Sequence, residues 1–196
     1  MSVQVVLVRP GATSYDEQAR VQGILDLPLS DRGTEEAIQL ATDLQHLGLT
    51  AVYSGPSQNA VQTAAHISAK AEVRPRQLDE LRNLDQGLWQ GLQFEDIRRR
   101  NHKVYRQWLE DPRTVCPPQG ETIEEALNRV KQTLRALLKR HRDQTIAIVV
   151  AEPMAKLIAA YLQGSCRFQF EEEVRTGHFE TLEVHWSLER NGHSVS

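Results

Sequence analysis

The stretch Val3-Gln4-Val5-Val6-Leu7-Val8-Arg9-Pro10-Gly11-Ala12-Thr13 decides the fold of this chain of 196 residues. Its apolar residues run almost without interruption to Val8, and the run ends at Arg9 and turns at Pro10-Gly11. Such a run predicts a strand that is buried on both faces, as in a parallel sheet. Because ligands of open α/β sheets bind beyond the carboxyl ends of the strands, we expect the functional site at Arg9 to Thr13.

The rest of the chain alternates between apolar runs and amphipathic helical patterns. Further strands are expected at 50–54, around Val73, at 145–151 and at 181–186, and helices at 31–47, 57–69, 92–109, 122–142 and 153–162. This alternation predicts a three-layer α/β/α sandwich around a mostly parallel central sheet. Neither a linker nor an internal repeat is visible, so we expect a single domain over 1–196.

Composition narrows the function classes. The net charge of −3 gives no general attraction to nucleic acid or to anionic membranes, and no apolar run is long enough to span a bilayer. The start of the chain lacks the features of a signal peptide, and Cys116 and Cys166 form no disulfide framework, so a cytoplasmic location is expected. The histidines show no metal-ligand spacing, so we expect neither a metal nor a cofactor.

Six short motifs follow one another along the chain. They are Leu7-Val8-Arg9-Pro10-Gly11-Ala12-Thr13, Gln22-Gly23-x-x-Asp26-x-Pro28-Leu29-Ser30-x-x-Gly33, Tyr53-Ser54-Gly55-Pro56 with Ala60-x-Gln62-Thr63-Ala64, Gly87-x-Trp89-x-Gly91, Pro117-Pro118-x-Gly120-Glu121-Thr122 and Val149-Val150-Ala151. Together they resemble the histidine phosphatase superfamily, also called phosphoglycerate mutase-like, over residues 3–162. Each motif alone is weak, but their common register makes the resemblance specific.

The resemblance implies phosphoryl transfer through a phosphohistidine. In that family a neutral imidazole attacks the phosphoryl group, while two arginines and a second histidine stabilise the phosphoryl oxygens. A glutamate moves the proton of the bridging oxygen, and no metal takes part. The resemblance also implies a phosphoglycerate mutase-like fold.

This sequence departs from the family pattern at the residues that perform the chemistry. The first arginine is kept as Arg9, but the nucleophilic histidine is Pro10 and the second histidine is Glu152. The second arginine maps to Asn59, and a phosphate-binding asparagine of many members maps to Asp16. Proline carries no nucleophile, and asparagine replaces neither the charge nor the forked donors of a guanidinium.

The catalytic glutamate of the family maps to Asn83, and a slip in register would place Glu80 there instead. Counted over all these positions, the pocket is about two charge units more negative than the family pattern, which disfavours a phosphate dianion. We therefore expect the family's active site to be degenerate and none of its catalytic positions to function.

Something must still neutralise Arg9 if it is buried. We expect Glu152, together with Asp16 as a further candidate, to pair with it and to turn the anion site into an internal ion pair. Residues that could bind a ligand in the altered pocket are Arg9, Gly11, Thr13, Gln22, Gly23, Asn59 and Glu152.

Three functional hypotheses stay open. The first is a catalytically inactive pseudophosphatase that binds a protein partner or a small ligand. The second is an enzyme with residual or rerouted phosphomonoester hydrolysis, for which Cys116 is a candidate nucleophile. The third is an inert structural subunit paired with an active relative. We expect a solvated helix face at Arg98-Arg99-Arg100. Trp89 and Trp108 are expected to be packing residues.

Overall fold

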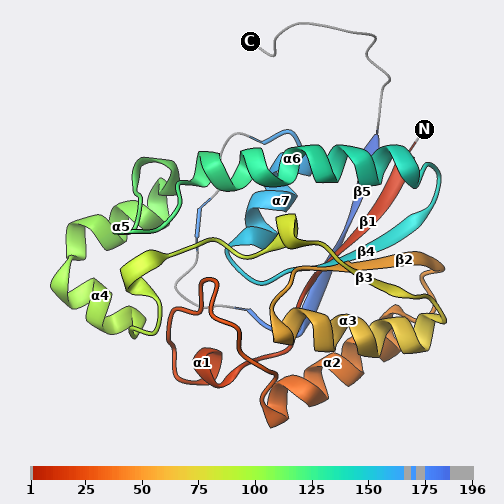
Figure 1. Cartoon of the computed structure of the whole chain (residues 1–196), viewed down its shortest axis with the longest axis horizontal. Coiled ribbons are helices and arrows are strands. Elements are labelled where there is room, and N and C mark those ends of the chain that lie inside the picture. Colours follow the sequence, from red (N-terminus) through yellow and green to blue (C-terminus); the bar gives the residue numbers. More distant parts are fainter. Residues whose placement is uncertain (1, 166–168, 171–174, 186–196) are drawn as a thin grey trace, which may run out of the picture.

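The structure, a computed structural model of the chain, describes residues 2–165, 169–170 and 175–185. Its centre is a five-stranded sheet with the strand order β3-β2-β4-β1-β5 (Figure 1). The strands are β1 (Ser2–Arg9), β2 (Leu49–Ser54), β3 (Pro75–Gln77), β4 (Thr145–Val149) and β5 (His178–His185). Neighbouring strands pair in parallel except for β5, which runs antiparallel to β1. The expected mostly parallel sheet is therefore confirmed.

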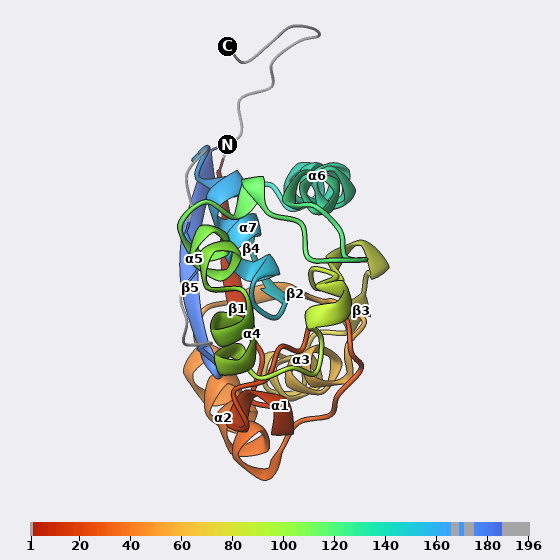
Figure 2. The ribbon, with the colours of Figure 1, turned by 90° about the vertical axis from the view of Figure 1, so that its left-hand side faces the viewer.

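Helices cover both faces of the sheet, because alternate residues of each central strand point to opposite sides. Val6 and Val8 pack against α2 (Asp31–Leu44) and α3 (Gln58–Ala71). Val5 and Leu7 pack against α6 (Ile123–Arg140) and α7 (Met154–Leu162). Figure 2 shows α2 and α3 together, well apart from α6, so the three-layer sandwich is confirmed.

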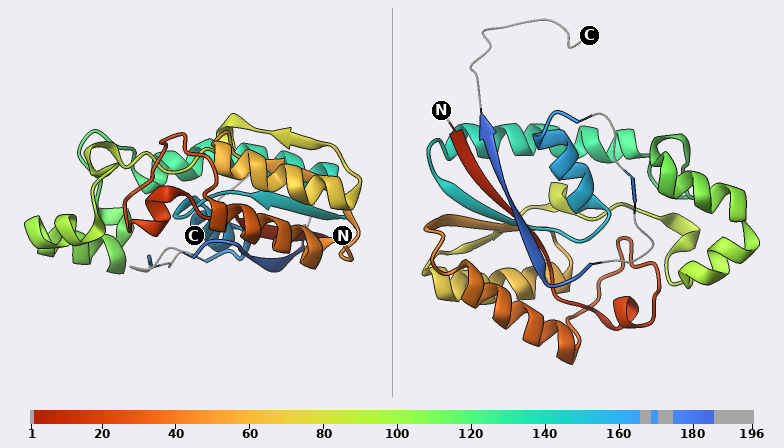
Figure 3. Two further views of the ribbon diagram at one scale, coloured as in Figure 1. Left: turned by 90° about the horizontal axis from the view of Figure 1, so that it is seen from below. Right: turned by 180° about the vertical axis from the view of Figure 1, so that it is seen from behind.

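The remaining helices stand beyond one end of the sheet. They are α1 (Ser14–Glu17), α4 (Phe94–Arg100) and α5 (His102–Glu110), and they lie at the end opposite the N-terminus (Figure 3). Strands β1 and β4 finish at this end, so the two segments that follow them, Pro10 to Thr13 and Ala151 to Pro153, run between the sheet and these helices.

Local signals explain where the helices begin. The side chain of Ser30 accepts a hydrogen bond from the backbone N–H of Gly33 at the start of α2, as expected for an N-cap. Thr122 and Glu125 form a capping box at the start of α6.

Gly11 and Gly33 are required by close packing, since a Cβ atom on Gly11 would lie 2.0 Å from the carbonyl oxygen of Gly33.

Several element boundaries were predicted wrongly. The helix expected at 92–109 is two helices, because Asn101 leaves the helical region with φ −137° and ψ 50°. The short third strand is Pro75–Gln77 and excludes Val73, whose N–H closes the turn after α3. Pro153 is the N-cap of α7 and not part of its first turn. Helix α1 was not foreseen, although Thr13 and Asp16 form a capping box there.

Some sequence features fall outside the described residues. These are Cys166, the acidic run Glu171-Glu172-Glu173 and Trp186, the expected end of the last strand. Among the described helices, none combines the length and the apolar character that a membrane span requires.

Candidate active site with a self-neutralised arginine

A cavity of about 320 Å³ lies where the strand ends meet α1, α4, α5 and α7. Most of the expected site residues line it: Arg9, Pro10, Gly11, Asp16, Gln22, Asn59 and Glu152. The other lining residues are Arg20, Gln86, Phe94, Trp108, Ala151, Pro153, Lys156, Phe170, Arg175, Thr176, His178 and Glu180. Thr13, Gly23 and Asn83 do not line the cavity.

Arg9 is buried at the end of β1, and carboxylates of the same chain neutralise it. Its Nε donates to Oε1 of Glu152 over 2.8 Å, and its Nη1 donates to Oε1 of Glu180 over 2.5 Å. The side chains of Arg9 and Glu152 are only 6% and 10% exposed, whereas that of Glu180 is 36% exposed. Burial alone would lower the pKa of Arg9, but Glu152 and Glu180 outweigh it and raise that pKa. The expected pairing of Glu152 with Arg9 is therefore confirmed.

Asp16 does not join this ion pair as the sequence had led us to consider. Its Oδ2 accepts hydrogen bonds from the backbone N–H and the hydroxyl of Thr13, at 2.7 and 2.8 Å. Burial raises the pKa of Asp16, and the hydrogen bonds from Thr13 offset part of that rise. Thr13 thus serves as the cap of α1 and not as a cavity-lining ligand contact.

His178 enters the cavity from β5, a position that the sequence did not single out. It is the register partner of Arg9 on the neighbouring strand, and its Nδ1 is buried without a hydrogen-bond partner among the described residues. Burial and the adjacent charge of Arg9 lower the pKa of His178, and Glu152 opposes them. The lowered pKa favours the uncharged form of the ring.

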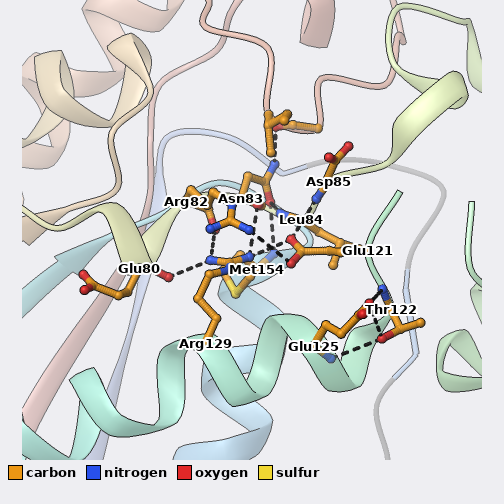
Figure 4. Close-up of polar contacts among 12 residues, drawn as sticks. Glu80, Arg82, Asn83, Leu84, Asp85, Glu121, Thr122, Glu125, Arg129 and Met154 are labelled. Carbon is orange, nitrogen blue, oxygen red and sulfur yellow. Dashed lines mark hydrogen bonds and ion pairs between the residues drawn. The ribbon is translucent and has the colours of Figure 1, made fainter. Parts of the chain in front are cut away.

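Asn83 is a structural residue of the loop that supports the cavity (Figure 4). Its Nδ2 donates to the carbonyl oxygens of Gly23 and Glu152, at 3.0 and 2.8 Å. Its Oδ1 accepts from the backbone N–H groups of Leu84 and Met154. The amide thus ties the loop after Gln22 to the segment after β4. All four contacts are internal to the chain, and Asn83, the position to which the family's catalytic glutamate maps, does not line the cavity.

A second anchor from α6 holds the same loop. Arg129 donates to the carbonyl oxygens of Glu80 and Arg82 and pairs with Glu121 over 2.6 Å (Figure 4). Burial lowers the pKa of Arg129, and Glu121 partly restores it. Glu80 contributes its backbone here, and its side chain does not line the cavity. Neither Asn83 nor Glu80 therefore presents a carboxyl to the cavity.

Asn59 and Gln22 do reach the cavity, as neutral amides. Asn59 is 1% exposed, and its Oδ1 accepts the backbone N–H of Ala60 at 2.9 Å. Nε2 of Gln22 contacts the carbonyl oxygen of Leu25 at 3.4 Å. Gly23 adopts a positive φ of +57° and packs against the side chain of Gln90, which explains a glycine there without a ligand.

The other candidates lie away from the cavity or pack within its walls. Cys116 is exposed, does not line the cavity and has its pKa raised by burial and by Glu125 and Asp85, so it is a poor nucleophile. Arg98 and Arg99 pair with acids on their own helix. Trp108 is buried and packs edge-on against Trp89, although one side of it reaches the cavity.

Glu180 and His178 are the site residues that sequence reasoning missed. Both lie on the one antiparallel strand, and they stand two positions apart on the strand face that carries Arg9. The one sequence feature that could have indicated Glu180 is its charge at the start of a strand in which apolar and polar residues alternate. The same pattern is expected of any solvent-exposed edge strand, so it does not point to a site. Among the described residues, no cluster of three or more histidine, cysteine, aspartate or glutamate side chains could hold a metal ion.

Comparison with known proteins agrees with this architecture. The sequence profile of the histidine phosphatase superfamily (branch 1) matches residues 5–186 of the chain. Phosphoserine phosphatase 1 of Hydrogenobacter thermophilus is 32% identical over 161 residues, which cover 82% of this chain and 76% of that protein.

Solved structures share the fold. The mycobacterial glucosyl-3-phosphoglycerate phosphatase superposes with a TM-score of 0.76 at 25% identity, over 83% of this chain and 80% of that one. Mycobacterial hydrolase 2 reaches a TM-score of 0.84 at 22% identity, over 96% and 84% of the two chains. With the profile match, the strand order and the arginine at the end of β1, the chain belongs to the histidine phosphatase superfamily.

Proposed function

We propose that this protein is a non-catalytic member of the superfamily, a pseudophosphatase whose altered pocket binds a small molecule other than a phosphate ester. The observation that carries the proposal is the contact of Arg9 with both Glu152 and Glu180 in a cavity where Pro10 stands at the nucleophile position. The names of the relatives point to phosphate esters as the substrates of active members.

Electrostatics supports the loss of phosphate binding. Arg9 is the one arginine that this chain keeps from the family pattern, and its charge is already shared between carboxylates. A phosphate oxygen at the same place would stand beside Glu152 and Glu180. Each such pair of like charges costs on the order of 4 kcal/mol at about 4 Å and an effective dielectric near 20. Glu152 and Glu180 thus oppose a phosphate dianion at Arg9, although Arg20, Lys156 and Arg175 also line the cavity.

Rerouted hydrolysis is the second candidate, and one observation favours it. His178 lines the cavity as a neutral imidazole, which is the state that a histidine nucleophile needs. It stands next to Glu152 and Glu180, however, and these carboxylates would oppose an approaching phosphate dianion. We therefore rank this function below ligand binding.

A phosphatase assay separates the two functions. Purified protein is incubated with p-nitrophenyl phosphate and with small sugar phosphates, beside the Arg9→Ala and His178→Asn variants. The exposed His185 on the same strand supplies a matched control, His185→Asn. The proposal predicts no turnover above the background in any of them. Turnover by the unmodified protein that disappears in Arg9→Ala or His178→Asn, and persists in His185→Asn, would overturn it.

A further inference from the structure

We infer that the cavity takes a zwitterion of the amino-acid type, an ammonium and a carboxylate on a compact apolar body. This inference rests on the proposed binding function and names the ligand class. The ammonium lies toward the strand ends, and the carboxylate lies toward the basic groups on the surrounding segments. The argument uses the distribution of charge, the free hydrogen-bonding atoms and the apolar wall.

The strand-end side of the cavity is acidic. Arg9 supplies one positive charge there, against the three carboxylates of Asp16, Glu152 and Glu180. Glu180 uses Oε1 for Arg9, and Asp16 uses Oδ2 for Thr13, while their other oxygens accept no hydrogen bond from the described residues. Two open carboxylate oxygens around a negative excess suit a group with several N–H donors and a positive charge.

His178 adds a polar group to this side without adding a charge. It lies two residues before Glu180 on the same strand face, and both line the cavity. Its Nδ1 is buried without a side-chain partner among the described residues, and the ring also lies beside the backbone of Thr176. Its lowered pKa favours the uncharged ring, so His178 adds no positive charge to offset the carboxylates around neutral pH.

The segments around the strand ends contribute the opposite charge. Arg20 follows α1, Lys156 lies in α7 and Arg175 precedes β5, and all three line the cavity. Arg20 uses Nε for Gln18 and Nη1 for the carbonyl oxygen of Gly91, so it keeps further donors in its planar fork. Such donors suit a single carboxylate, which brings less negative charge near Glu152 and Glu180 than a phosphate dianion does.

An aromatic wall completes the cavity on the side of α4 and α5. Phe94, Trp108 and Phe170 line it, and the rings of Trp108 and Phe170 are 4.9 Å apart between centroids. The backbone N–H of Phe94 bonds to the carbonyl oxygen of Ala19, which holds this wall beside Arg20. The volume of about 320 Å³ is at the small end of ligand pockets, which fits one amino-acid-sized molecule.

Matched probes test each half of this assignment by calorimetric titration. L-phenylalanine carries both charges, phenethylamine lacks the carboxylate, 3-phenylpropionate lacks the ammonium, and inorganic phosphate carries only negative charge. We expect L-phenylalanine to bind most tightly and each half-probe to bind about tenfold or more weakly, as loss of one charged hydrogen-bonding group implies. We expect no heat of binding from phosphate.

Two variants assign the ends of the ligand. Glu180→Gln should weaken L-phenylalanine and phenethylamine by about tenfold and leave 3-phenylpropionate unchanged or tighter. Arg20→Gln should weaken L-phenylalanine and 3-phenylpropionate and leave phenethylamine unchanged. Glu183→Gln is the control, because Glu183 is exposed on the same strand and does not line the cavity. Urea unfolding of each variant confirms that it is folded.

Other outcomes contradict the inference. Absence of binding by L-phenylalanine and by both half-probes would overturn the ligand class, as would tighter binding of phosphate than of L-phenylalanine. Equal losses for all probes in Glu180→Gln would overturn the assigned orientation. The phosphatase assay stands apart from these results, since turnover would refute the proposed function whether or not the zwitterion binds.

Discussion

Arg9 is a buried cation at the end of a buried strand, and its environment determines what the cavity can hold. In place of an external anion, Glu152 and Glu180 each give one oxygen to its guanidinium. Glu152 is the more buried of the two carboxylates, and its other oxygen faces the backbone N–H of Lys156 at 3.3 Å. The charge of Arg9 thus stabilises the fold through internal ion pairs and also lies in the site.

Removing one partner of this group should destabilise the fold unequally. Glu152→Ala leaves a buried cation short of its main partner and should lower the free energy of unfolding by about 3–5 kcal/mol. Glu180→Ala should cost less, because the Glu180 side chain is 36% exposed and water screens the loss. Urea unfolding at neutral pH measures both, with Glu183→Ala as the exposed control. A loss in Glu152→Ala no larger than in the control would contradict this account.

His178 should make stability sensitive to mild acid. Its folded-state pKa is lowered by burial and by Arg9, so the unfolded chain binds the proton more readily. Stability is therefore complete above the unfolded pKa of about 6.5 and falls as the pH drops through that value toward the lower folded pKa. His178→Asn should remove part of this fall, and His185→Asn should not. Urea midpoints across this pH range measure the difference, and identical pH profiles of wild type and His178→Asn would refute it.

At the scale of elements, the site depends on how loops are tied together. The loop of residues 79–85 joins α6 through Arg129, and it joins the segment after β4 through Asn83. Asn83 also reaches the carbonyl oxygen of Gly23, so one buried amide fixes two walls of the cavity. Its donors and acceptors are all used, which an aspartate or a glutamate cannot reproduce.

Asn83→Ala should be among the most destabilising polar substitutions in the chain. It leaves buried backbone groups without partners, and we expect a loss of about 3 kcal/mol in the free energy of unfolding. Asn83→Asp should also destabilise, because it loses both donors. Asn128→Ala, at an exposed residue of α6, is the control. Thermal unfolding compares the three variants, and a neutral Asn83→Ala would show that the loop is held by other contacts.

Sequence reasoning was reliable where local chemistry decides the element. The caps at Ser30 and Thr122 and the apolar run before Arg9 predicted α2, α6 and β1. It failed at Asn101, where the polar periodicity continues through a break in the backbone, and at Thr13, whose cap begins a helix too short to show periodicity. The features that were not predicted depend on pairing between strands that are far apart in the sequence.

The difference between predictable and unpredictable residues is clearest in the candidate site. The pairing of Glu152 with Arg9 was predictable, because Arg9 ends β1 and Glu152 follows β4, the neighbouring parallel strand, and each strand belongs to a recognisable motif. Glu180 and His178 come from β5, outside any motif, and only the antiparallel register with β1 brings them to Arg9. Asn83 shows the opposite case, since a residue aligned with a catalytic position serves a structural purpose here.

At the scale of the whole molecule, the fold is that of the histidine phosphatase superfamily, and our proposal is that its catalytic chemistry is lost. Restoring the family residues with Pro10→His, Asn59→Arg and Glu152→His should not be enough, because Glu180 still holds Nη1 of Arg9. Adding Glu180→Gln to these three changes should allow hydrolysis of p-nitrophenyl phosphate to appear or to increase. Equal rates with and without Glu180→Gln would show that Glu180 is no obstacle. Asn83→Glu is best left out, since it would break the loop that supports the cavity.

The central claim is that the carboxylates of this chain occupy the place of a phosphate at Arg9, and a calorimetric titration with inorganic phosphate tests it most directly. The unmodified protein is compared with Glu152→Gln/Glu180→Gln, which keeps the shape of both side chains and removes their charges. The account predicts no detectable binding by the unmodified protein and measurable binding by the double variant, since each removed charge pair costs on the order of 4 kcal/mol. Phosphate binding by the unmodified protein that is as tight as in the double variant would contradict it.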